Sequence, residues 1–189
     1  MALVTPPPSS ETVRALDNLK DFLQPGDASP SRTTLPVGVP VFVVVGLNQI
    51  NRGDDILSIA KPAGWRFLVS TDFGQPIAAD VTTRAGAAPK MTSVWRGSPI
   101  QQVVSAKDTI KRLDQVQTGN YELRILRLPE LRIEAYWLKS LTNDRDLVVP
   151  VLTLAKELNP LQPYPVDKFR QIVSDLSAKE FPDKTKPRR

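Results

Sequence analysis

The sequence predicts an α+β fold: a mostly antiparallel sheet of about six or seven strands, a helix in the middle of the chain, a C-terminal helix and an N-terminal amphipathic helix. Two periodicities carry this prediction. Between Tyr121 and Thr153, apolar and charged residues alternate with the period of two that is typical of strands. From Pro99 to Gly119, and again from Val166 to Leu176, apolar residues recur at the spacing typical of amphipathic helices.

Three strands are expected between Tyr121 and Thr153, and they should form the centre of the sheet. The first two are expected to form a hairpin with the loop Leu128-Pro129-Glu130, because Arg124 then faces Glu134 while the apolar residues share the other side. One long bent strand with a bulge at the proline is the alternative. The third strand, Leu147 to Leu152, contains a proline, which indicates an edge position or a bulge.

Further strands are expected upstream, where β-branched and aromatic residues gather between turn residues. They are Val41 to Val45, Trp65 to Ser70, Ile77 to Arg84 and Met91 to Arg96. With the helices, the order becomes three strands and a helix used twice, a βββα-βββα layout preceded by one extra strand. The two halves share no residue-level similarity, so the layout alone suggests a repeat.

The first forty residues are expected to hold a helix and a proline-rich linker. The helix begins after Ser9, ends at Pro25, and carries its apolar residues on one stripe, so it should dock on its own domain rather than on another chain. The predicted organisation is 1–40 for this arm, 41–181 for a single α+β domain and 182–189 for a basic disordered tail.

The net charge of +5 points only weakly to an anionic partner. Residues 179–189 carry five basic residues against two acidic ones, so much of the excess lies in the predicted tail. A nucleic-acid partner is therefore not expected, because no basic stripe with interleaved aromatics lies on a predicted element. No apolar run approaches the ~18 residues that a membrane span requires. A cytoplasmic protein without a membrane partner is the expectation.

The chain contains no cysteine and no histidine. This composition excludes disulfides, thiolate nucleophiles and the Ser-His-Asp and Cys-His catalytic arrangements. Phosphate-binding glycine loops are also missing from the sequence. Asp54 and Asp55 form the only adjacent carboxylate pair and could hold Mg²⁺, but a turn with a helix cap explains the pair better. No cofactor and no metal are expected.

The predicted binding site is the charged side of the hairpin. It combines Arg124, Arg132, Glu134 and Tyr136 with the neighbouring Glu122, and arginine and tyrosine are favoured in recognition surfaces. The alternative is a solvated sheet face that cross-strand charge pairs steady. The three tryptophans lie within strand patterns and are expected to pack in the core.

Two classes of function remain. The first is a non-catalytic protein-interaction or structural module, whose partner is another protein or a second copy of the chain. The second is a small-ligand-binding protein or an enzyme that uses carboxylates or lysine. A pocket with at least two carboxylates or a buried lysine would favour the second class, and a flat apolar patch or a symmetric dimer would favour the first.

Overall fold

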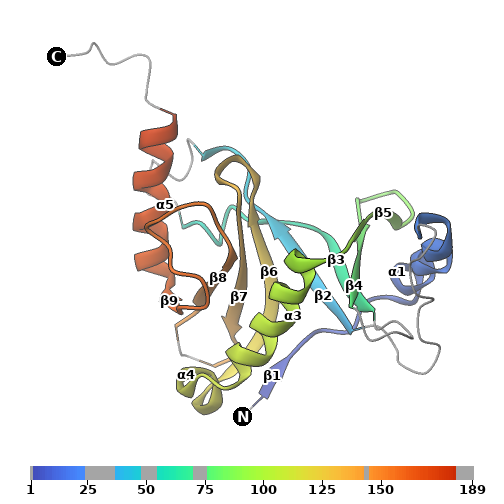
Figure 1. Ribbon diagram of the computed structural model, residues 1–189, viewed down its shortest axis with the longest axis horizontal. Coiled ribbons are helices and arrows are strands. Elements are labelled where there is room, and N and C mark those ends of the chain that lie inside the picture. Colours follow the sequence, from blue (N-terminus) through green and yellow to red (C-terminus); the bar gives the residue numbers. More distant parts are fainter. Residues whose placement is uncertain (1, 24–36, 48–54, 70–75, 143–144, 182–189) are drawn as a thin grey trace.

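The computed structural model describes residues 2–23, 37–47, 55–69, 76–142 and 145–181. It confirms the α+β class: one nine-stranded, mostly antiparallel sheet with helices on both faces (Figure 1). The strands are β1 (Ala2–Val4), β2 (Val37–Val43), β3 (Lys61–Val69), β4 (Ile77–Thr82), β5 (Lys90–Trp95), β6 (Asn120–Leu128), β7 (Ile133–Ser140), β8 (Leu147–Leu152) and β9 (Tyr164–Pro165). The helices are α1 (Ser10–Arg14), the 3-10 helices η1 (Ala15–Phe22) and η2 (Pro129–Leu131), α3 (Ser98–Lys111), α4 (Asp114–Thr118) and α5 (Val166–Glu180).

The sheet has the order β5-β4-β3-β2-β6-β7-β8-β9, and β1 lies beside β6 as well. Only β1 and β2 run parallel to β6; the other pairs of neighbours are antiparallel. β3–β5 and β6–β8 each form a meander followed by helices, which is the predicted order with α4 and β9 added. Both β6 and β7 lie inside the sheet, as expected.

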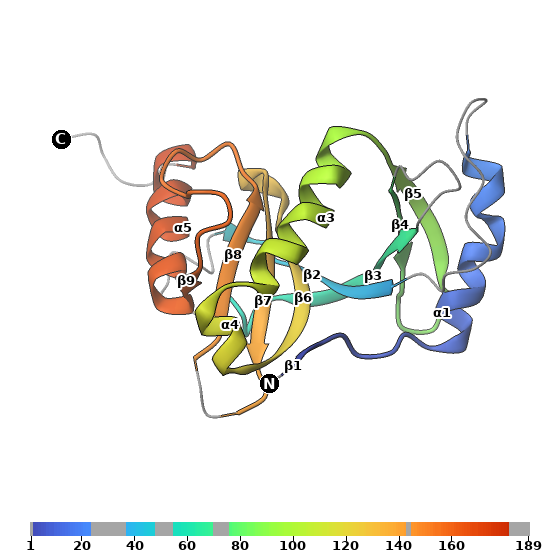
Figure 2. The ribbon, with the colours of Figure 1, turned by 60° about the horizontal axis from the view of Figure 1, so that its bottom comes forward.

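Opposite faces of β6 carry different helices. Val103 and Ile110 of α3 pack in one core with Leu123 of β6, whereas α5 packs in a second core with Leu126 and Leu128. Because neighbouring residues of a strand point to opposite faces, α3 and α5 cover opposite sides of the sheet. Figure 2 shows α3 between the two halves of the sheet and α5 beyond β8.

The N-terminal helix docks on its own sheet. Leu19 of η1 is buried in a third core with Phe67 of β3 and Ile77 of β4, on the far side of the molecule from α5 (Figure 2). Ser9 caps α1 by accepting a hydrogen bond from the Thr12 N–H, as the sequence predicted, but most of the predicted helix is the 3-10 helix η1.

Gly64 allows β3 to lie close to β4 where the register between β2 and β3 shifts. Its φ is 151°, and a Cβ there would come within 2.0 Å of the Val81 carbonyl oxygen, so only glycine fits. The bulge lies between Val41 and Phe42 on β2. Irregularities of this kind bend a sheet, which brings charged residues of β3 and β4 towards β6 and β7.

The hairpin of β6 and β7 was predicted correctly, but its register was wrong. The turn is Pro129–Leu131 plus Arg132, and Leu128 pairs with Ile133, so Arg127 rather than Arg124 lies opposite Glu134. Arg132 closes this longer turn in the left-handed conformation, with φ 54° and ψ 42°. The antiparallel pairing also excludes the single bent strand.

Several other expectations can be placed. Pro150 of β8 lies next to a register shift against β7, and β9 pairs only with Leu147 and Val148, so the proline lies at a bulge and beyond the paired part of the edge.

The short strands β1 and β9 were not predicted from the sequence. Asp55 forms a turn, in which Ser58 N–H donates to its carbonyl oxygen, whereas Asp54 and the predicted tail 182–189 lie outside the described residues, as does most of the predicted linker.

No helix in the described part of the chain is long and apolar enough to cross a membrane.

Candidate functional site

The four residues of the predicted binding face do not share one face. Arg124 lies on the α5 side, where its guanidinium carbon is 4.7 Å from the ring centre of Phe42 and 4.5 Å from that of Trp137. Glu134 and Tyr136 lie on the α3 side, since they pair with Arg127 and Ile125 of β6. Arg132 lies in the turn and is exposed. A single charged surface built from these residues is therefore wrong.

Tyr136 is a core residue. Its side chain is 1% exposed and its hydroxyl donates a hydrogen bond to the carbonyl oxygen of Val103 in α3, at 3.0 Å. Burial raises the pKa of Tyr136, and the negative charge of Glu134 raises it further. The Tyr136 hydroxyl therefore links α3 to the sheet, and the side chain is too deeply buried to contact a partner protein.

Tyr136→Phe is expected to remove an alkaline loss of stability. The folded protein retains the Tyr136 proton above the ordinary pKa of 10.0, where the unfolded chain releases it, so the free energy of unfolding falls as pH rises through that value. One pH unit above it the loss is about 1.4 kcal/mol. Urea unfolding of both proteins in neutral and alkaline buffer measures this effect. A stability difference between them that stays constant with pH would contradict it.

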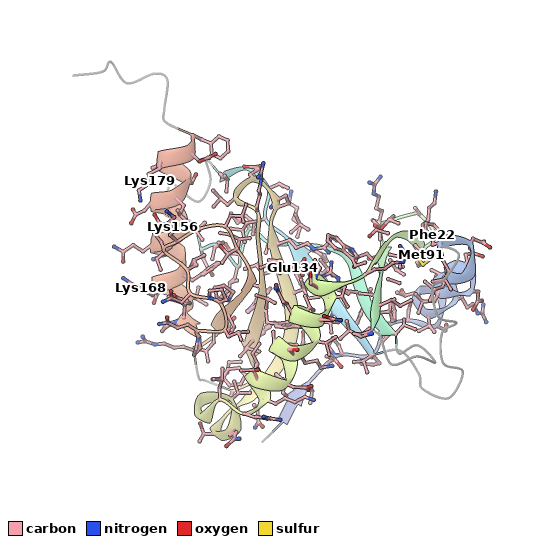
Figure 3. All side chains as sticks on the ribbon, viewed as in Figure 1. Phe22, Met91, Glu134, Lys156, Lys168 and Lys179 are labelled. Atoms are coloured by element: carbon pink, nitrogen blue, oxygen red, sulfur yellow. The ribbon has the colours of Figure 1, made fainter. Side chains whose placement is uncertain are left out.

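Glu134 belongs to a buried network of two arginines and two carboxylates. Arg66 of β3 is 1% exposed and donates through Nε to Asp80 Oδ1 at 2.8 Å and through its terminal nitrogens to Asp80 and Glu134. Arg127 of β6 bridges the same two carboxylates, with Nε to Glu134 Oε2 at 2.9 Å and a terminal nitrogen to Asp80 Oδ2 at 2.8 Å. Figure 3 places Glu134 in the middle of the molecule. The network ties the two meanders together across β2.

Trp95 at the end of β5 covers this network. Its ring centre lies 4.8 Å from the guanidinium carbon of Arg66 and 5.5 Å from that of Arg127, and its Nε1 donates to Asp80 Oδ2 at 2.7 Å. Ser93 adds a hydrogen bond from its hydroxyl to the same oxygen. Trp95 is 37% exposed, so it covers the charged network at the surface and is not the core residue that was expected.

The charges of the network balance, and each member has partners. Burial by itself disfavours the charged form of Arg66, but the carboxylates of Glu134 and Asp80 outweigh it and raise the pKa of Arg66. Burial also raises the pKa of Glu134, against the opposing charge of Arg66. No buried side-chain nitrogen or oxygen among the described residues lacks a hydrogen-bond partner. A network in which every buried group has a partner ties the strands together, and we interpret it as structural.

A cleft of about 680 Å³ lies between α3 and the end of β8. One wall is formed by residues 98–106 of α3, which contribute four polar uncharged side chains and the buried Ala106. These polar residues are Ser98, Gln101, Gln102 and Ser105. The other wall is formed by residues 151–154 and 160–161, and Arg132 also lines the cleft. Leu154 is 73% exposed there.

The backbone around this cleft is held in an uncommon conformation. Among the described residues, the non-glycine residues with positive φ are Arg132 (54°) and Leu161 (65°), and both line the cleft. The Leu161 N–H donates to the Pro150 carbonyl oxygen at 2.8 Å, which fixes the loop against β8. Left-handed backbone at side chains that are not glycine often marks functional sites.

Arg132→Gly is expected to raise the free energy of unfolding by up to about 1 kcal/mol, because glycine adopts the left-handed conformation without the steric penalty of a Cβ. Chemical denaturation measures the change, and Arg84→Gly in an exposed loop is the control. A clear destabilisation by Arg132→Gly would show that the arginine serves folding, and the cleft would lose its main functional argument.

Arg132 carries an uncompensated charge. None of the ion pairs in the described part of the chain includes it, whereas Arg124 pairs with Glu122 and Arg127 with two carboxylates. A second hollow of about 480 Å³ shares Arg132 and Leu154 with the cleft and continues along α5. The two hollows therefore form one groove, with the arginine where they meet.

Among the described residues, no group of three or more Asp or Glu residues is arranged to hold a metal ion. Comparison with known proteins found no matching family model, no matching curated protein and no matching solved structure.

Proposed function

We propose that the protein is a non-catalytic interaction module that binds a segment of another protein in the cleft between α3 and β8. The observation that carries this proposal is the combination of an exposed leucine, Leu154, and an unpaired cation, Arg132, in one concave site. Neither side chain has a visible role in folding. Exposed apolar side chains beside a few polar groups are typical of recognition sites.

The composition of the walls supports binding rather than chemistry. The cleft contains one charged residue, Arg132, and no carboxylate that could act as a general acid or base. Serine and glutamine side chains of α3 can donate and accept hydrogen bonds to a peptide backbone in several geometries. The cleft volume also falls within the range of ordinary ligand sites, about 300–1,000 Å³.

A specific observation favours the second class of function, a small-ligand binder or carboxylate enzyme. The neighbouring hollow holds three glutamates, Glu130, Glu157 and Glu180, together with Lys156 and Lys179. We rank it lower, because a hydrogen bond from Lys179 at 2.9 Å lowers the pKa of Glu157 and keeps it ionised, and both groups are exposed. A catalytic acid needs a raised pKa. Figure 3 shows both lysines on the α5 side.

The test is affinity capture from cell extract with three forms of the full chain. Ser105→Trp fills the cleft from its α3 wall, and Thr109→Trp places the same ring one turn further along the exposed side of α3, outside the cleft. Partners bound by the wild type and Thr109→Trp but lost with Ser105→Trp support the proposal. Partners retained equally by all three would refute binding at this cleft. The cytoplasmic location expected from the sequence stays a prediction.

A further inference from the structure

We infer that the occupant of the cleft is an extended acidic peptide of a partner protein, with a carboxylate on Arg132 and an adjacent aliphatic side chain on Leu154 and Leu161. This inference rests on the proposed function and adds the chemical class of the ligand. Arg132 is the one charged residue that lines the main cleft, and no ion pair of the described residues neutralises it.

A carboxylate is the natural complement of this group. The planar guanidinium of arginine offers two parallel N–H donors that match the two oxygens of a carboxylate. The next free cation along the groove, Lys156, has the same sign and is likewise outside the ion pairs of the described chain. The other lysine of that hollow, Lys179, is already paired with Glu157. The second hollow as a whole has no net charge, because Glu130, Glu157 and Glu180 balance Arg132, Lys156 and Lys179. The positive charge that a carboxylate of the ligand would meet is therefore that of Arg132 in the main cleft.

The α3 wall adds to the same sign. Ser98 begins this fourteen-residue helix and lines the cleft. The first turn of α3 contains no acidic residue, and no side chain caps its free N–H groups. The partial positive charge of a helix N-terminus is therefore not compensated locally, which favours a negative group in the adjacent cleft. This contribution is smaller than that of Arg132 and supports it.

The apolar part of the groove favours a ligand that also carries an aliphatic side chain. Leu154 is 73% exposed and Leu161 is 36% exposed, and both line the cleft together with Arg132. An aliphatic side chain next to the carboxylate would cover them and remove their surface from water. An extended peptide reaches both features, because its successive side chains alternate in direction and its backbone can bond to the glutamines of α3.

The experiment uses two fluorescein-labelled pools of seven-residue peptides with one fixed leucine and randomised flanks. One pool carries glutamate two positions after the leucine, and the other carries glutamine there. Fluorescence anisotropy measures binding of each pool to the full chain and to three variants. Arg132→Gln removes the charge in the cleft, Arg84→Gln removes an exposed arginine elsewhere and so controls for net charge, and Ser105→Trp blocks the cleft.

We expect the glutamate pool to bind the wild type about tenfold more tightly than the glutamine pool, as one charge-assisted bond allows. This preference should survive in Arg84→Gln, disappear in Arg132→Gln and weaken at high salt. Ser105→Trp should abolish binding of both pools.

Other results would contradict the acidic ligand, the role of Arg132 or binding at the cleft. If Ser105→Trp blocks binding but the two pools bind alike, the cleft is a docking site and the acidic ligand is wrong. If the preference persists in Arg132→Gln, the charge is read elsewhere. If Ser105→Trp changes nothing, the proposed function at this cleft fails as well. Sedimentation could instead show a concentration-dependent dimer that Ser105→Trp dissociates. A second copy of the chain would then be the occupant of the cleft, and the proposal of a partner peptide would be wrong.

Discussion

Replacing Arg66 with methionine is expected to lower the free energy of unfolding by about 3 to 5 kcal/mol, because removing one partner of a buried ionic network leaves the others unpaired. Methionine retains much of the length of the side chain, so the effect comes from charge rather than volume. Asp80 would lose two hydrogen bonds and Glu134 one, next to Arg127 as the remaining cation. Urea unfolding with a near-ultraviolet probe, which reports on the neighbouring Trp95, measures the loss.

The matched control for this change is Arg170→Met. Arg170 also pairs with a carboxylate, that of Asp167, but the two groups lie 3.8 Å apart and their side chains are 37% and 76% exposed. Its replacement should therefore lower the stability by no more than about 1 kcal/mol. Equal losses in the two variants would show that the buried network has no special weight. A partial recovery when Asp80→Asn is added to Arg66→Met would confirm that the unpaired carboxylate causes the loss.

Trp137→Ala is expected to destabilise the protein by about 3 to 5 kcal/mol, as large-to-small replacements in a packed core do. Trp137 is 5% exposed, meets the ring of Phe42 edge-on at 5.2 Å and donates through Nε1 to Asp146 Oδ2 at 2.8 Å. It thus joins β2, β7 and the approach to β8. Chemical denaturation gives the change in free energy.

Leu141→Ala serves as the control for this prediction. Leu141 follows β7 directly but is 52% exposed, so its truncation should change stability by no more than about 0.5 kcal/mol. A loss for Trp137→Ala within that range would mean that the centre of the sheet lies elsewhere.

The elements could be predicted from the sequence because their periodicities are strong. The helix Ser98–Lys111 and the strand Leu147–Leu152 lie where the patterns placed them. The register of the hairpin could not be predicted, because it depends on whether Arg132 joins the turn in a left-handed conformation. A shift of this kind exchanges the two faces of a strand. Arg124, which the alternation of charge placed opposite Glu134, therefore lies on the other face of the sheet.

The buried network was also missed, although it left a signal. Arg66 and Asp80 are single charges inside otherwise apolar strands, and such charges must find partners when the strand is buried. Which partners they find depends on the bend of the sheet across β2, which no local pattern records. The expectation that charged strand residues face solvent fails here because helices cover both faces of the sheet.

The candidate cleft could be anticipated only in part. Arg132 was among the predicted binding residues, and its role as such stays a prediction, but Leu154, Leu161 and the α3 wall belong to segments far apart in the sequence. Their meeting is a product of tertiary packing. The conformation of the loop at 160–161 follows from its hydrogen bond to β8 rather than from its own residues.

Amide hydrogen exchange of the full chain, measured with and without an excess of the glutamate pool of peptides, tests most directly whether the cleft is the binding site. The account predicts slower exchange in the first half of α3, in residues 151–154 and at Leu161, with β5 and η1 unchanged. Slower exchange confined to β5 and η1, at the far end of the sheet, would contradict it.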